Sequence, residues 1–188
     1  VGAIIVLISL GQGVDTFVKK EFLNLGVNVI YVSATEPVND RHQRIEPLTT
    51  ADITALQDPA IASSISQVGG EYNVLGYLTA NGEHMRTTVH GVTPNMGELM
   101  NWNVNLGSFI TDQQIANMDR VAVLGVGVVE KLFGNQDVDP LGEVIRINDQ
   151  AFTVVGVMDS RSFAALGTEL DENSIVFIPI STAQTRLA

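Results

Sequence analysis

The sequence of 188 residues contains no cysteine, and this absence excludes several kinds of chemistry at once. A disulfide framework, a thiol nucleophile, a Cys-ligated zinc site and an iron–sulfur cluster all require cysteine. Basic residues are also few, because 10 Lys and Arg stand against 21 Asp and Glu and give a formal net charge of -11. Such a charge repels phosphate backbones and anionic membrane surfaces, so nucleic acid is not an expected partner.

The chain also lacks an apolar run long enough to cross a membrane, which needs about 20 residues. The longest uncharged start, Val1 to Leu10, stops after ten residues at Gly11. It has two interpretations. It is either a buried strand or core helix at the start of a soluble domain, or the end of a truncated first transmembrane helix over residues 1–10. Hydrophobic residues make up 45% of the chain and charged residues 16%, a balance typical of a folded domain rather than a disordered tail.

Motifs for nucleotide chemistry are incomplete. Gly125-Val126-Gly127 follows a predicted strand and opens a predicted helix, as a dinucleotide fingerprint does. The third glycine of that fingerprint is replaced by Glu130, whose carboxylate would oppose a pyrophosphate at the helix start. No phosphate-binding P-loop motif is present either. We therefore interpret the two glycines as a tight strand-to-helix turn.

Catalytic and metal-binding patterns are missing as well. No serine lies in the G-x-S-x-G context of a nucleophile elbow. His84 and His90 are six residues apart in one predicted strand, which separates them by about 20 Å and is too far for one metal. The acidic residues at 137, 139, 169, 171 and 172 follow no calcium-loop spacing and are interpreted as solvated loop charge. We expect no enzyme activity, no cofactor and no metal.

Hydrophobic periodicity and turn residues predict helices and strands in a mixed order. In the first part of the chain we expect a helix from Gly13 to Gly26, a strand over 27–34, a loop over 35–47, a short helix capped by Thr49, and a strand over 61–68. Asn81-Gly82 between two strand-like runs, 72–79 and 85–92, predicts a hairpin with a type I′ turn.

The second half continues the pattern. We expect short helices over 96–100 and 112–118, a strand over 120–124, a helix over 128–133 ended by Gly134, paired strands over 143–147 and 152–158 around Asn148-Asp149, a strand over 174–180, and a helix from Ser181. The long connection over 159–173 is interpreted as mobile or functional.

These elements indicate the α+β class in a two-lobed arrangement. An α/β subdomain of the βαβ type, made of residues 11–72 and 151–188, would be split by an inserted β-rich subdomain with short helices over residues 73–150.

Several short motifs, in one order over nearly the whole chain, resemble the MacB-like periplasmic core domain of ABC transporter permeases, in the MacB/FtsX-like permease family. They include the strand entry LGVNVIYV at 25–32, LTTAD at 48–52, HGVTP at 90–94, GSFIT at 107–111, RVAVLG at 120–125, LFG at 132–134, DPLG at 139–142, FTVVGV at 152–157 and VFIPISTA at 176–183. Ser108 stands where the family usually has Arg.

The resemblance implies an extracytoplasmic domain between the first and second membrane spans of a bacterial inner-membrane permease, on the periplasmic or extracellular side. It implies an ABC ATPase, a second permease copy or homologue, and a periplasmic adaptor or exported cargo as partners. Such a domain would transmit ATP-driven conformational change and engage substrate or partner for export or efflux. A soluble extracytoplasmic binding domain of other ancestry is the alternative.

Two polar elements far from both termini are candidate contact sites for a partner or cargo. The hairpin tip carries Glu83, His84 and Met85. The connection over 159–173 carries Arg161, Phe163 and Leu166. Apolar anchors mixed with charge suit a binding rim, although both elements are also explained as long connections.

Overall fold

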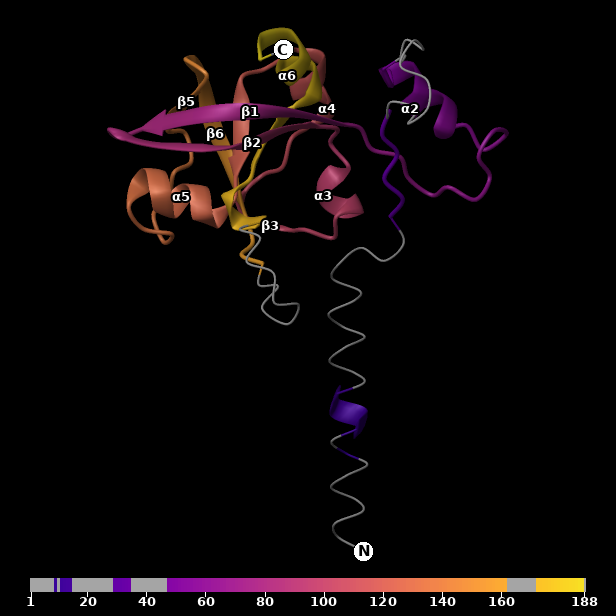
Figure 1. The fold of residues 1–188 in the computed structure, drawn as a ribbon, viewed down its shortest axis with the longest axis horizontal. Coiled ribbons are helices and arrows are strands. Elements are labelled where there is room, and N and C mark those ends of the chain that lie inside the picture. Colours follow the sequence, from indigo (N-terminus) through magenta and orange to yellow (C-terminus); the bar gives the residue numbers. More distant parts are fainter. Residues whose placement is uncertain (1–8, 10, 15–28, 35–46, 162–171, 188) are drawn as a thin grey trace, which may run out of the picture.

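Seven strands form one sheet in the computed structural model, which describes residues 9, 11–14, 29–34, 47–161 and 172–187 (Figure 1). Their order is β3-β6-β4-β7-β2-β1-β5, with a further pairing between β6 and β5. The strands are β1 Glu71–Ala80, β2 Glu83–Val92, β3 Val104–Gly107, β4 Val121–Leu124, β5 Val144–Ile147, β6 Gln150–Met158 and β7 Val176–Pro179.

The pairing between β6 and β5 closes the sheet into a ring. The first half of β6 pairs with β5, as in Ile145↔Phe152, and β5 in turn pairs with β1 at Leu78↔Ile147. The second half of β6 pairs with β3 along the same edge that pairs with β5. The opposite edge of β6 pairs with β4. A closed ring of this size is filled by its own side chains.

Both predicted hairpins are confirmed, and their turns explain why. Asn81 and Gly82 have φ values of 53° and 82°, and Asn148 and Asp149 have 46° and 66°. Type I′ turns require positive φ at both central positions, which Asn, Asp and Gly adopt most readily. These turns set the registers of β1 with β2 and of β5 with β6.

Two hydrophobic cores lie on opposite faces of the strands. The larger one fills the ring and includes Leu78, Leu124 and Phe152, together with residues of α5 and α6. The smaller one lies on the outer side of β4 and β7, where Phe177 packs edge-on against Trp102 with ring centroids 5.7 Å apart. The ring is therefore packed on both sides of β4 and β7.

Short helices complete the fold. Thr111 begins α4 with a capping box, since its side chain accepts from the Gln114 N–H and the Gln114 side chain accepts from the Thr111 N–H. The helices are α2 Thr50–Leu56, α3 Met96–Leu99, α4 Asp112–Ala116, α5 Val126–Phe133, the 3-10 turn η2 Glu172–Ser174, and α6 Ile180–Arg186.

Some expectations were wrong. Residues 61–68 form turns rather than a strand, residues 29–34 have no regular structure, and β3 was not predicted. A strand needs a partner edge to satisfy its backbone groups, and among the described residues these two stretches have none. The helix predicted from Gly13 is helical over 11–14, and its remainder lies outside the described residues, as does nearly all of 1–10.

The α+β class is confirmed, whereas the two-lobed arrangement is not. β2, from the predicted insertion, pairs in parallel with β7, from the other predicted subdomain. The described strands of both parts thus share one sheet, and the boundaries 11–72, 73–150 and 151–188 stay a prediction.

Candidate functional site

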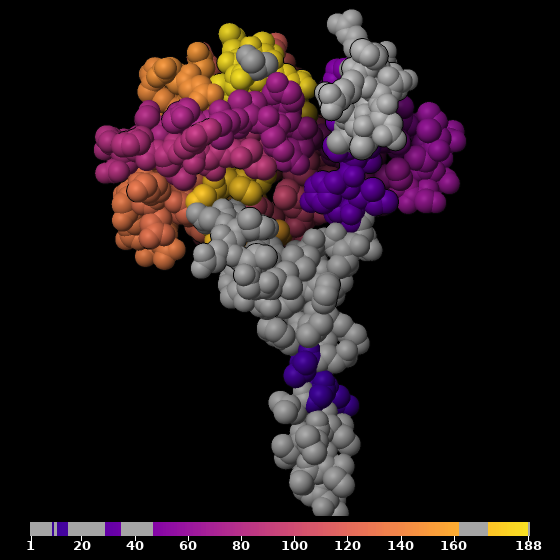
Figure 2. Space-filling model, in the orientation of Figure 1, coloured from indigo at the N-terminus to yellow at the C-terminus, as the bar shows by residue number. Residues whose placement is uncertain are grey.

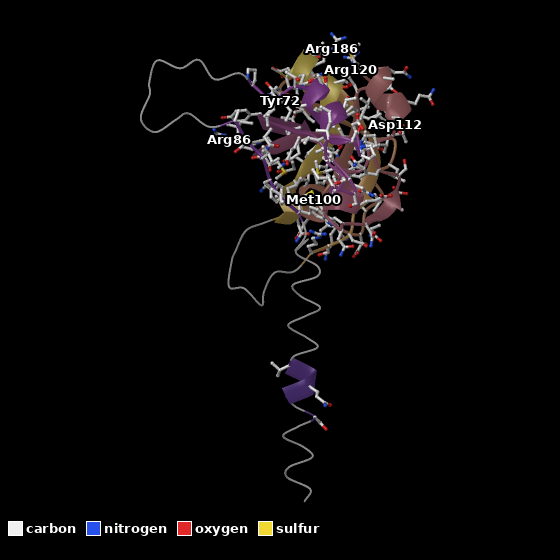
Figure 3. All side chains as sticks on the ribbon, turned by 90° about the vertical axis from the view of Figure 1, so that its right-hand side faces the viewer. Tyr72, Arg86, Met100, Asp112, Arg120 and Arg186 are labelled. Carbon is white, nitrogen blue, oxygen red and sulfur yellow. The ribbon has the colours of Figure 1, made fainter. Side chains whose placement is uncertain are left out.

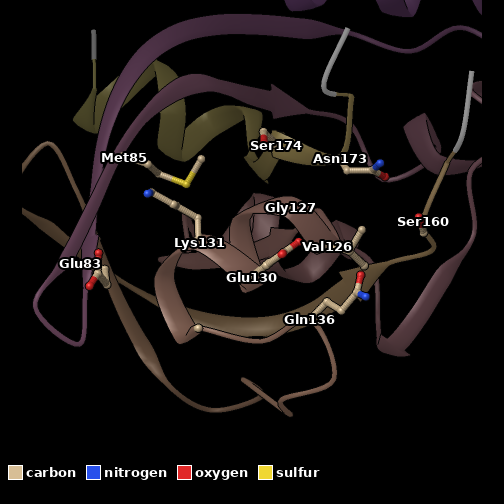
Figure 4. A pocket seen from close by; sticks show the side chains of 11 residues that line it. Glu83, Met85, Val126, Gly127, Glu130, Lys131, Gln136, Ser160, Asn173 and Ser174 are labelled. Atoms are coloured by element: carbon tan, nitrogen blue, oxygen red, sulfur yellow. The ribbon is translucent and has the colours of Figure 1, made fainter. Parts of the chain in front are cut away.

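A groove of about 690 Å³ opens where the tip of the β1–β2 hairpin, α5 and η2 meet (Figure 4). We call it the tip groove. Four separate stretches of chain contribute to it, at residues 83–85, 126–136, 160 and 173–174. Its lining is Glu83, Met85, Val126, Gly127, Glu130, Lys131, Gly134, Gln136, Ser160, Asn173 and Ser174.

The close approach of α5 and η2 depends on glycine. A Cβ on Gly125, the residue that begins α5, would lie 2.2 Å from the Asn173 carbonyl oxygen. A Cβ on Gly127 would lie 2.9 Å from the Ser174 hydroxyl oxygen. The two glycines thus form the predicted tight strand-to-helix turn. The close contact between α5 and η2, which requires glycine at both positions, forms a wall of the tip groove.

Charged and amide side chains predominate in the tip groove. Glu83 and Glu130 contribute carboxylates and Lys131 an ammonium group, and Met85 is the long apolar side chain among them. Small-molecule pockets are usually enclosed and mostly apolar. This open, polar groove is better suited to a segment of another protein.

The structure separates the three predicted residues of the hairpin tip. Successive side chains of a strand point to opposite faces, so Glu83 and Met85 line the tip groove. His84 is exposed on the other face, opposite Thr79. The tip therefore presents two surfaces instead of one.

Arg161 anchors the start of the predicted contact loop. Its guanidinium lies over the Trp102 ring and donates to the carbonyls of Met100 and Asn101. Its backbone N–H donates to Asn173 Oδ1 at 2.9 Å, and Asn173 Nδ2 donates to the Arg161 carbonyl at 2.8 Å.

Asn173 therefore ties the two ends of the loop together beside the tip groove. Phe163 and Leu166 lie outside the described residues.

Sequence reasoning did not connect Glu130, Lys131 or Asn173 with the hairpin tip. The signal that could have found them is the glycine pair at 125 and 127, since glycine at a helix start permits another backbone to approach closely. Nothing in the local sequence indicates that η2 is the segment that approaches α5.

Within the part of the chain that the structure describes, His, Asp and Glu form no group that could hold a metal ion. Over the same residues, no helix combines the length and apolarity that crossing a membrane requires.

The fold is that of extracytoplasmic domains of ABC-type transporters. The crystal structure of the periplasmic region of MacB from Actinobacillus actinomycetemcomitans superimposes with a TM-score of 0.69 at 20% identity, covering 88% of this chain and 71% of that one. The extracellular domain of the noncanonic ABC-type transporter YknZ from Gram-positive bacteria gives a TM-score of 0.62 at 21% identity, over 74% and 66% of the two chains.

The chain belongs to the MacB-like periplasmic core domain family, whose model matches residues 1–188. It is 30% identical over 191 residues to the macrolide export ATP-binding/permease protein MacB of Chlorobaculum tepidum, covering 100% of this chain and 28% of that protein. It is 31% identical over 187 residues to the pyoverdine export ATP-binding/permease protein PvdT of Pseudomonas syringae pv. syringae, covering 100% and 27%. The chain thus spans under a third of the length of these relatives, and the family match excludes the alternative of other ancestry.

Proposed function

We propose that this chain is the extracytoplasmic domain of an ABC exporter permease, which transmits ATP-driven conformational change and engages a cargo or partner protein. Family membership supports the transport role, because the relatives are export ATP-binding/permease proteins. ATP hydrolysis then belongs to another part of the transporter or to a separate ATPase subunit. The domain would lie on the periplasmic or extracellular side of a bacterial inner membrane.

We further propose that contact is made at the tip groove and the loop beside it. One observation carries this proposal: residues from both predicted contact elements border the same groove, Glu83 and Met85 from the hairpin and Ser160 and Asn173 from the ends of the loop. A cargo, a periplasmic adaptor or a second permease copy seated there would touch both elements at once.

The proposal is tested in the full-length permease by replacing Phe163 and Leu166 with Ser together, and separately by Glu83→Lys. We expect export or adaptor capture to fall while the amount of folded permease stays unchanged. Ile61→Ser is the matched control, since Ile61 is a 65% exposed apolar residue elsewhere. Normal export by the correctly folded double mutant and by Glu83→Lys would contradict the proposed contact.

A further inference from the structure

The outer face of the β1–β2 hairpin is a second exposed surface, separate from the tip groove. On this face Tyr77 lies opposite Arg86, Leu75 opposite Thr88, and Thr79 opposite Arg146 of β5. We call these six residues the outer hairpin face. Figure 2 shows β1 and β2 as a continuous band along the surface of the molecule.

Two large side chains of this face are open to solvent. Leu75 is 49% exposed and Tyr77 is 60% exposed, although the intervening Gly76 and the next residue, Leu78, are buried. Single exposed apolar residues are normal on a protein surface. Leu75 and Tyr77 are informative because basic residues lie beside them on the same face.

The charge of the face is opposite to that of the chain. The exposed positions of this face between Asn73 and Thr79, and between His84 and Thr88, contain no Asp or Glu, and neither do those of β5. Arg86 and Arg146 lie among them, in a chain whose formal net charge is -11. Figure 3 shows Arg86 at the surface, on the far side of the domain from Asp112.

Among the described residues of β1, β2 and β5 and the turns next to them, acidic residues lie at the borders of this face. Glu71 at the start of β1 is engaged by His90, and Glu83 points to the tip groove. Glu143 and Asp149 flank the two ends of β5. The face is therefore a local basic and apolar surface on an acidic domain.

The side chains and the backbone of the face are held in place. The Arg86 guanidinium lies over the Tyr77 ring, 5.5 Å from its centroid, and stacking of this kind leaves the guanidinium N–H groups free to meet a carboxylate. Asn148 Oδ1 accepts from the Tyr77 N–H at 2.8 Å, and its Nδ2 donates to the Leu75 carbonyl at 3.1 Å. Because these groups are already ordered before a partner binds, association costs less conformational entropy.

We infer that the outer hairpin face docks an acidic segment of a partner protein that also carries an apolar side chain. Arg86 and Arg146 bind carboxylates, and Leu75 and Tyr77 accept the apolar group. A protein segment fits better than nucleic acid, because an extended polyanion would meet the repulsion of the acidic domain beyond this small surface. The inference rests on the proposed function, since it gives the partner-engaging domain a specific surface.

The experiment uses the chain of 188 residues and a short fluorescent peptide of Glu and Leu, with a Lys and Leu peptide and a Glu and Ser peptide for comparison. We expect the Glu and Leu peptide to bind with the highest affinity, and salt to weaken that binding. Arg86→Glu should lower the affinity by about tenfold or more, and Tyr77→Ser by a similar factor. Arg120→Glu is the control, with the same charge change at an exposed position outside this face.

Equal effects of Arg86→Glu and Arg120→Glu would overturn the inference, as would equal binding of the Lys and Leu peptide. Preferential binding to anionic vesicles or to single-stranded DNA would overturn it in favour of those ligands. Circular dichroism verifies that each variant is folded. Since the peptide assay does not involve transport, its failure is distinguishable from a failure of the proposed function, which the export assay with Phe163, Leu166 and Glu83 reports.

Discussion

Arg161 lies over the indole ring of Trp102, with the guanidinium carbon 4.7 Å from the ring centroid. Trp102 is only 3% exposed, and its Nε1–H donates to the Asp159 carbonyl at 2.7 Å. The segment that leads out of β6 is thus fastened to the smaller core at two successive points. A residue predicted from sequence as a partner contact therefore has a structural role at the start of the loop.

We expect Arg161→Ala to lower the free energy of unfolding by about 1–3 kcal/mol, because hydrogen bonds from a charged donor and stacking on Trp102 are lost together. Arg161→Lys should recover only part of this, since an ammonium group lacks the planar fork. Urea unfolding followed by Trp102 fluorescence measures both. Arg186→Ala, at an exposed site on α6, should change stability by about 0.5 kcal/mol or less. A loss at Arg161 no larger than at Arg186 would contradict the anchoring role.

Two glycines allow steric and conformational effects to be separated. In Gly125→Ala the new Cβ would meet the Asn173 carbonyl, so η2 must move and we expect a loss of about 1–3 kcal/mol. Gly134 ends α5 at φ 83° with open space around it, so Gly134→Ala should cost about 1 kcal/mol through backbone strain alone.

Gly134→Asn should be nearly neutral, because Asn tolerates this conformation. Thermal unfolding of the three variants gives the comparison. If Gly125→Ala were the mildest of them, the close approach of η2 to α5 would not exist in solution.

Local chemistry explains which parts of this fold were predictable. Asn81-Gly82, Asn148-Asp149 and the Thr111 capping box each act within a few residues, so the hairpins and α4 could be read from sequence. β3 could not, because its four residues form a strand only through pairing with the end of β6. Residues 61–68 show the converse, since a stretch predicted as a strand forms turns where no partner edge is available among the described residues.

The closure of the sheet and the tip groove were beyond sequence reasoning for the same reason. β2 and β7 pair across more than eighty residues of chain, as in Val89↔Val176. Such pairing depends on the whole topology rather than on neighbouring residues. The sequence predicts Glu83 and Met85 as polar and apolar residues of the hairpin tip. Their position beside Lys131 and Asn173 in one groove follows from this long-range pairing.

We expect the chain to bind neither ATP nor NAD. Glu130 replaces the third glycine of the dinucleotide fingerprint, and the sequence has no P-loop motif. Isothermal titration with each nucleotide should give only heats of dilution. Saturable heat at micromolar concentration with either ligand would contradict this expectation.

Glu71, the first residue of β1, is paired with a histidine of β2. His90 Nδ1 hydrogen-bonds to its carboxylate and packs beside Phe177, with ring centroids 5.8 Å apart. This hydrogen bond lowers the pKa of Glu71 below its ordinary value of 4.5, and the opposing effect of burial is smaller. Because the pKa is lower in the folded state, ionised Glu71 contributes stability above pH 4.5, and this contribution is lost as the pH falls through the lowered value.

Glu71→Gln should therefore lower the free energy of unfolding at neutral pH, and the difference from the unmodified chain should shrink as the pH falls below 4.5. Urea unfolding at neutral pH and in acid measures the two differences. His90→Asn provides the control for the cause: in its background, Glu71→Gln should lose most of its pH-dependent effect, because the hydrogen bond that lowers the Glu71 pKa is already gone. If the stability difference caused by Glu71→Gln were independent of pH both in the unmodified chain and in the His90→Asn variant, Glu71 would act through packing instead of through its charge.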